Sequence, residues 1–162
     1  MSRPHEEAFI AAFDEFADAL FRHARYRVSD REKAADLAQD AFLKAWDYVR
    51  DGGEVHHWKS FLYRVLNNLI IDEYRRAKEV SLDSMMEDDP AHTGALTSFD
   101  GRAEAEERLD DEMLIIRIRS FIPQLPETLR VAVALRYIDG FSPKEIAGLL
   151  ETSENVVSVR IH

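Results

Sequence analysis

Apolar residues recur every three or four positions along the first 80 residues, and this spacing predicts three amphipathic helices. The helices are predicted to end near Val28, Gly52 and Lys78, and Ser29 with Glu32 has the spacing of a capping box at the start of the second. The residues predicted to face the core are Phe9, Ile10, Phe13, Phe16, Ala17, Leu20 and Phe21 in the first helix, Leu37, Ala38, Ala41, Phe42, Ala45, Trp46 and Val49 in the second, and Trp58, Phe61, Leu62, Val65, Leu66, Leu69 and Ile70 in the third. These stripes predict a three-helix bundle.

Residues 125–162 have the pattern of a helix-turn-helix unit. The leading helix is predicted to stop at Asp139-Gly140, because glycine readily adopts the left-handed conformation that ends a helix. Ser142 and Glu145 then have capping-box spacing, with a proline at the first helical position. An ordinary helical hairpin is the alternative reading, but the short turn and the free outer face of the following helix favour a DNA-binding unit.

The last helix of this unit is predicted to begin at Ser153. Val157 and Ile161 are four residues apart and are expected to pack against the preceding helix. The residues on its outer face and flank, which would meet DNA, are Asn155, Ser158, Val159, Arg160 and His162. This face is poorly basic and the sequence stops within the helix, so we expect a unit that is incomplete at its C-terminal end and holds DNA weakly.

Composition narrows the class of protein. The chain has 162 residues, of which 46% are hydrophobic, and it contains no cysteine. These values predict an all-α globular protein without a disulfide scaffold, and no stretch approaches the roughly 20 apolar residues of a membrane span. No phosphate-binding loop or catalytic motif is present, and the adjacent His56 and His57 diverge too much for a metal site. We therefore expect no enzyme, cofactor, metal or membrane insertion, and a cytoplasmic location.

Charge is distributed unevenly along the chain. The formal net charge is -10, and residues 81–120 hold 11 acidic and 4 basic side chains. Residues 81–101 lack helical periodicity and predict a flexible linker. We therefore expect a domain at 1–80, an acidic linker at 81–111 and a second domain at 112–162. The acidic segment either serves solubility or competes with DNA for a basic surface.

The third predicted helix mixes aromatic, basic and amide side chains, a combination that suits single-stranded DNA. The polar residues and the tyrosine expected to lie away from its core stripe are Lys59, Tyr63, Arg64, Asn67, Asn68, Arg75 and Arg76. The alternative is that the aromatic residues Trp58, Phe61 and Tyr74 belong to the core.

Three phrases of the sequence, DLAQDAFLKAW, WKSFLYRVLNNLIIDEYRR and LPETLRVAVALRYIDGFSPKEIAGLL, occur in this order. Together they resemble bacterial sigma factors of the extracytoplasmic-function (ECF) type, in the sigma-70 family, over nearly the whole chain. The resemblance implies a helical region 2, a linker and a helical region 4. It also implies a function: directing RNA polymerase to promoters and initiating transcription.

The resemblance assigns roles to residues. It implies that Asp36, Gln39, Asp40 and Lys44 dock on the clamp helices of the largest subunit of core RNA polymerase. It places the loop 51–57 where the family takes up a base flipped from the −10 element. The residues implied to contact the −10 DNA are Gly53, His56, His57, Lys59, Asn67, Asn68, Arg75 and Arg76. From the spacing alone, Asp72 is expected to pair with Arg75 or Arg76 instead of touching DNA.

The final helix matches the one that reads the −35 element, through Ser153, Asn155, Ser158, Arg160 and His162. The sequence departs from the family at three positions: the family usually has a basic residue at Asn67 and at Ser158, and often a glycine at Glu151. An anti-sigma factor is also implied as a partner. The alternative function is a sigma-like interaction module that binds an anti-sigma factor without productive DNA binding.

Overall fold

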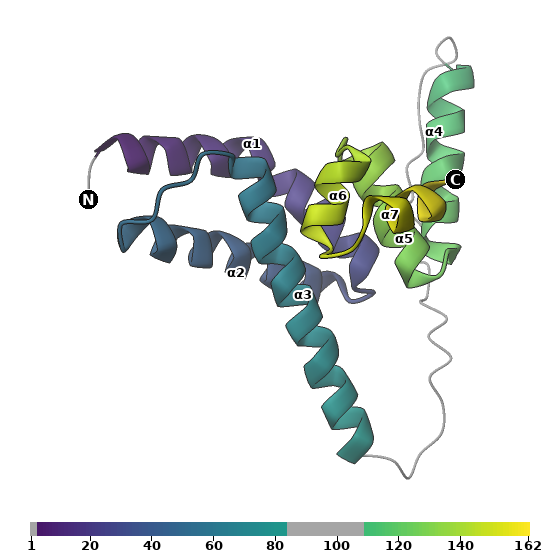
Figure 1. The fold of residues 1–162 in the computed structure, drawn as a ribbon, viewed down its shortest axis with the longest axis horizontal. Helices are drawn as coiled ribbons and strands as arrows, with labels where there is room; N and C mark the ends of the chain where they lie inside the picture. The colour runs from purple at the N-terminus through teal and green to yellow at the C-terminus, as the bar shows by residue number, and fades with distance from the viewer. Residues whose placement is uncertain (1–2, 84–108) are drawn as a thin grey trace.

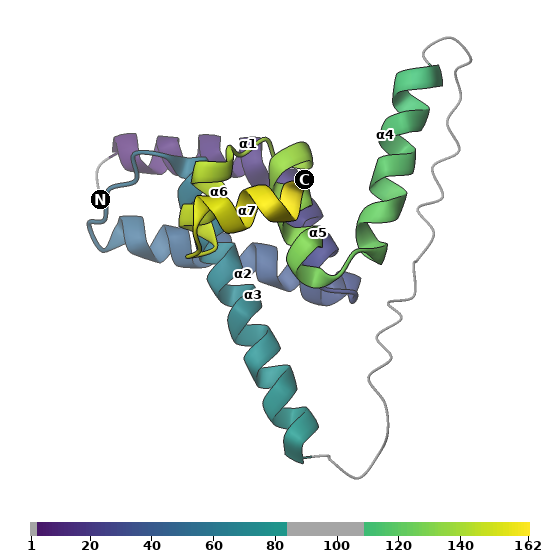
Figure 2. The same cartoon turned by 45° about the vertical axis from the view of Figure 1, so that its right-hand side comes forward.

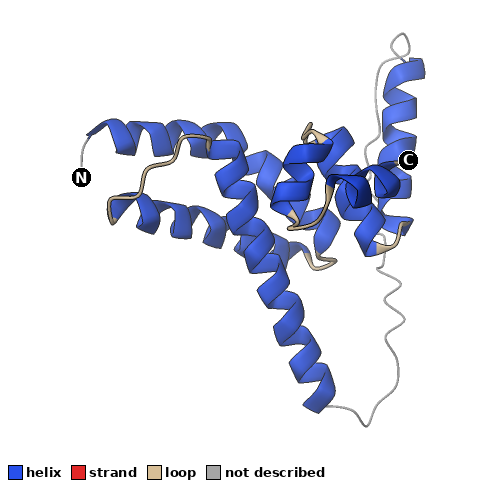
Figure 3. Ribbon diagram, viewed as in Figure 1, coloured by secondary structure: helices blue, strands red, loops and turns tan. Residues whose placement is uncertain are grey.

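The computed structural model describes residues 3–83 and 109–162, and every regular element in these ranges is helical (Figures 1 and 3). The expected all-α class is confirmed. The elements are α1 Arg3–Arg27, α2 Arg31–Arg50, α3 Trp58–Asp83, α4 Leu109–Phe121, the 3₁₀ turn η1 Ile122–Gln124, α5 Glu127–Val133, the π-helical turn η2 Ala134–Ile138, α6 Pro143–Leu149 and α7 Glu154–Ile161.

Helices α1, α2 and α3 form the expected bundle (Figure 1). The predicted stripes of α2 and α3 are buried or partly buried in it, and aromatic rings of Phe9, Phe42 and Trp58 meet edge to face. The prediction that Ile10 faces the core is wrong, because this side chain is 52% exposed. Phe13 packs on Phe42, as a core-facing residue would, but is 46% exposed. The apolar stripe of α1 is therefore wider than the surface that the other two helices cover.

The cap of α2 differs from the prediction. Asp30, not Ser29, occupies the N-cap position, and its carboxylate accepts hydrogen bonds from the backbone N–H groups of Glu32, at 2.9 Å, and Lys33, at 3.4 Å. The carboxylate is also attracted by the positive end of the helix dipole. The capping box expected from Ser29 and Glu32 is wrong by one residue.

The local signals of the C-terminal half are confirmed. Gly140 has a φ of 76°, and the Ser142 hydroxyl and the Glu145 carboxylate form both bonds of the capping box of α6. Glu151 adopts a φ of 52° without being glycine, a conformation that costs free energy for a side chain of this kind. Ser153 then caps α7 by accepting a hydrogen bond from the Val156 N–H at 3.2 Å.

The predicted linker, 81–111, lies outside the described residues from 84 to 108. On either side of that gap, α3 continues through Asp83 and α4 begins at Leu109. Figure 2 shows α4 standing to one side of the other helices. Within 3–83 and 109–162, no helix is both long and apolar enough to cross a bilayer.

The two helical halves are in contact. Helix α1 packs against α5 and η2, and α3 packs against α6 (Figures 1 and 2). One continuous core includes residues of both halves, among them Leu66 of α3 and Ile146 of α6. Helix α6 therefore covers one face of α3, which decides which of its side chains remain exposed.

Candidate nucleic-acid interface

Helix α2 presents an exposed polar strip opposite its buried stripe. Asp36, Gln39, Asp40 and Lys44 are all exposed, whereas Leu37, Ala38, Ala41 and Phe42 between them are buried. The spacing of three and four residues places the four side chains on one side of the helix. A rigid apolar backing and an open polar face suit docking onto another protein.

The loop between α2 and α3 is shaped by two glycines. Gly52 has a φ of 96°, which favours glycine, and the Gly53 N–H donates to the Tyr48 carbonyl at 2.9 Å. A Cβ added at Gly53 would lie 2.3 Å from the Tyr48 ring, which packs on Phe61 at a centroid distance of 5.1 Å. Gly53 is therefore required for the close approach of Tyr48, and this contact holds the loop against α3.

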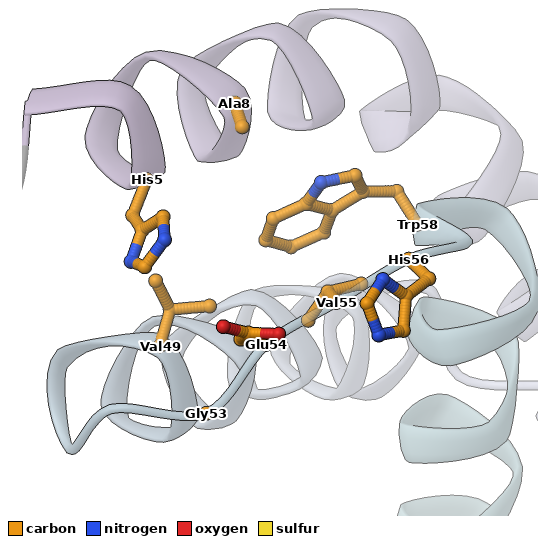
Figure 4. A pocket seen from close by; sticks show the side chains of 8 residues that line it. All are labelled: His5, Ala8, Val49, Gly53, Glu54, Val55, His56 and Trp58. Carbon is orange, nitrogen blue, oxygen red and sulfur yellow. The ribbon is translucent and has the colours of Figure 1, made fainter.

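A hollow of about 230 Å³ opens between this loop and the first turns of α1 (Figure 4). It is lined by His5, Ala8, Val49, Gly53, Glu54, Val55, His56 and Trp58. Figure 4 shows the indole of Trp58 and the imidazole of His5 on opposite sides of the opening. His57, which the sequence grouped with His56, is not among the lining residues, and His5 enters from a segment that the motifs did not implicate.

The exposed side of α3 carries a polar stripe. Arg64, Asn68 and Arg75 are exposed and fall within about 40° of one another around the helix at 100° per residue. Arg75 lies 4.0 Å from Asp72, so the expected intrahelical pair is confirmed. Trp58, which lines the hollow, is the first residue of α3, and the stripe starts at Arg64 further along the same helix.

Arg76 lies beside this stripe in a different environment. Its guanidinium donates to Glu73 at 2.8 Å, and Lys33 of α2 binds the same carboxylate. Hydrogen bonds from Lys33 and Arg76 hold the pKa of Glu73 below its ordinary value. Sequence reasoning missed Glu73, although its position three residues before Arg76 could have indicated the pair.

The face of α3 beside this stripe, on the side of Tyr63 and Asn67, is covered. Tyr63 and Asn67, expected to lie away from the core, are 1% and 3% exposed. Arg27 donates to the Asn67 Oδ1 at 2.8 Å, and the Asn67 Nδ2 donates to the Leu149 carbonyl at 3.4 Å. The expectation fails because α6 packs on this face of α3.

The carboxylate of Asp139 lies at the centre of the contact between the halves. It accepts hydrogen bonds from the Tyr63 hydroxyl at 2.7 Å and from the His23 Nδ1 at 3.1 Å, and it pairs with Arg22 at 3.6 Å. Because a carboxylate only accepts, the His23 Nδ1 must carry a proton. Burial lowers the pKa of His23 and raises that of Tyr63, so this site favours a neutral imidazole and a protonated phenol.

The outer face of α7 is open. Ser153, Asn155, Val159 and His162 are exposed, and Val159 is 78% exposed, whereas Ser158 and Arg160 are half-buried. Val157 is buried against the preceding helices, as expected. The structure therefore provides a free helix face but confirms its low density of positive charge.

The chain matches two protein-family models. Residues 12–80 match Sigma-70 region 2, and residues 115–162 match Sigma-70 region 4. The ECF RNA polymerase sigma factor SigW of Bacillus subtilis is 27% identical over 161 residues, which cover 97% of this chain and 84% of SigW. The RNA polymerase sigma factor SigZ of the same species is 32% identical over 149 residues, which cover 92% of this chain and 78% of SigZ.

Two solved structures have a similar fold. The sigma factor RpoE in complex with the anti-sigma factor NepR from Bartonella quintana gives a TM-score of 0.69 at 22% identity, covering 96% of this chain and 90% of RpoE. CnrH in complex with the cytosolic domain of CnrY gives a TM-score of 0.60 at 22% identity, covering 96% of this chain and 81% of CnrH. The two matched regions and the 32% identity to SigZ establish the family: this chain is an ECF-type member of the sigma-70 family of RNA polymerase sigma factors.

Proposed function

We propose that each of the exposed surfaces described above has one task in promoter recognition. The strip of α2 docks on the clamp helices of core polymerase, the hollow and the stripe of α3 bind the melted −10 strand, and α7 reads the −35 element. Residues 1–80 and 112–162 act as the two binding domains, and 81–111 join them. The chain itself carries out no chemistry and acts in the cytoplasm, where the polymerase works.

One observation supports this proposal above the others: α3 starts at the hollow and carries an exposed polar stripe away from it. A base leaving the duplex loses a few kcal/mol of stacking. Stacking on an aromatic side chain such as Trp58 returns about 1–3 kcal/mol. The cations Arg64 and Arg75 would hold the following phosphates, so one helix serves both the flipped base and the backbone.

A second partner is an anti-sigma factor. RpoE and CnrH have this fold, and both were solved with a bound protein, which is described as an anti-sigma factor for RpoE. We extend such an interaction to this chain. The alternative, a sigma-like module that binds an anti-sigma factor without DNA, is favoured by the burial of Asn67 and by the weakly basic α7. DNA binding by the assembled polymerase separates the two functions.

Replacing Arg64 and Arg75 with alanine should reduce the salt dependence of binding. For single strands, the slope of log K against log salt falls by about 0.7 for each phosphate that the protein no longer neutralises. The double variant should therefore lower the slope by about 1.4 when bound to core polymerase and a fork DNA with an unpaired −10 strand. Equilibrium binding measured between about 50 and 200 mM salt provides the test.

Arg31→Ala is the control for removal of an arginine from another surface, because Arg31 is also exposed but begins α2. Its slope should equal that of the unchanged chain. An unaltered slope in the double variant would contradict the assignment of the α3 stripe to DNA.

A further inference from the structure

The contact between the two halves has a polar centre. The side chain of Asp139 is fully buried, and its partners Tyr63, His23 and Arg22 all belong to α1 or α3. Asp139 itself follows η2 in the C-terminal half. Every polar partner recorded for this carboxylate within the described residues therefore lies across the contact.

The position of Asp139 is unfavourable within its own half. It ends a helical turn, where the unpaired carbonyl groups make the C-terminal end of the helix dipole negative. A buried carboxylate also loses hydration that only hydrogen bonds and opposite charges replace. Since the local sequence does not stabilise an acid here, the contacts with Tyr63, His23 and Arg22 account for its burial.

Two polar residues of α3 are engaged in the same contact. The Lys59 ammonium donates to the Asp139 carbonyl and lies 4.5 Å from the centre of the Phe141 ring. The Asn67 amide lies between Arg27 and the Leu149 carbonyl. The family resemblance assigns both Lys59 and Asn67 to the −10 strand, and the contact between the halves covers both.

The contact between the two halves also limits how far apart on DNA they can bind. The nominal positions −10 and −35 lie about 25 base pairs apart, which is roughly 85 Å at 3.4 Å per base pair. The halves that would bind them pack directly against each other. Both elements cannot be bound while the halves remain in contact.

We propose that Asp139 is a latch that holds α5 to α7 on α1 and α3, and that this closed form withholds Lys59 and Asn67 from DNA until the latch opens. The DNA part of this inference rests on the proposed function, whereas the latch itself is a property of the free chain. On opening, Asp139, His23, Tyr63 and Lys59 exchange these contacts for water, whereas the apolar core that the halves share favours the closed form.

Two variants test the latch. Asp139→Asn removes the charge and keeps the shape, and it also relieves the unfavourable helix end, so the C-terminal half should remain folded. Tyr63→Phe removes the donated hydroxyl but keeps the ring, which packs on Phe141 at 5.0 Å. Each variant loses a hydrogen bond to a charged group, so the open population should rise by about tenfold or more.

The distance between the halves is the measurement. The chain contains no cysteine, so spin labels at Ala35→Cys on α2 and Lys144→Cys on α6 are unique. Electron–electron double resonance on the full chain should give one narrow distance distribution for the parent. For Asp139→Asn and Tyr63→Phe it should give an added broad population at longer distance, with the helical circular dichroism unchanged.

Tyr137→Phe and Asp14→Asn are the controls, because both parent side chains are exposed; both should keep the narrow distribution. The latch is wrong if the parent distribution is already broad, or if Tyr63→Phe leaves it narrow. Such results leave the proposed function standing, because the salt-slope experiment on Arg64 and Arg75 tests that function independently.

Discussion

Replacing Asp36 and Asp40 with arginine should weaken the binding of this chain to core RNA polymerase by at least about 100-fold. Both carboxylates are exposed on α2, four residues apart, on a helix whose other side is buried. Charge reversal at the centre of a docking surface creates like-charge contacts that cost several kcal/mol. Fluorescence anisotropy with labelled chain and core polymerase would measure the change in Kd.

The control for this experiment lies on α1. Asp14 and Asp18 are also exposed and also four residues apart, so Asp14→Arg with Asp18→Arg changes the net charge by the same amount. This pair should leave the Kd within a few-fold of the parent. Equal losses for both pairs would mean that overall charge, and not the strip of α2, governs the association.

Leu66→Ala should destabilise the fold by about 2–5 kcal/mol. The Leu66 side chain is completely buried in the core that α1, α2 and α3 share with the C-terminal half. Removing its methyl groups leaves a cavity whose surroundings relax only in part. Urea unfolding, followed by circular dichroism, would give the change in the free energy of unfolding.

Leu43→Ala makes the same chemical change at a site that is 54% exposed, on α2. It should alter the free energy of unfolding by less than about 0.5 kcal/mol. Similar losses for Leu43 and Leu66 would contradict the position of the core.

The helices could be predicted because their signals are local. Apolar spacing placed α1, α2 and α3, and Ser142 with Glu145 marked the start of α6 through contacts only three residues apart. The cap of α2 was missed by one residue, because Ser29 and Asp30 are both good cap residues and only the backbone conformation distinguishes them.

The covered face of α3 could not be predicted from α3 itself. Tyr63 and Asn67 are polar and lie four residues apart, which is also the pattern of a solvated face. Their burial depends on Asp139 and Leu149, which follow them by 76 and 82 residues in the sequence. The sequence did contain one signal of this burial. Asn67 is uncharged at a position where the family usually has a basic residue, and a second positive charge beside the buried Arg27 would be unfavourable.

The residues that line the hollow could likewise be predicted only in part from the sequence. The family resemblance pointed to the loop 51–57, and the structure places Gly53 and His56 in its lining. His5 joins them only because α1 packs antiparallel to α2 (Figure 1), so its first turn returns to the loop. Residues brought together by packing, and not by spacing, carry the part of the site that the sequence did not reveal.

Transcription from a promoter library by purified core polymerase, with start sites mapped by sequencing, tests the proposed role in promoter recognition most directly. We expect that adding this chain creates discrete start sites downstream of shared −10 and −35 elements. We also expect that Asp36→Arg with Asp40→Arg abolishes these starts, whereas Asp14→Arg with Asp18→Arg retains them. A chain that binds core polymerase or an anti-sigma factor but adds no start sites would contradict this role.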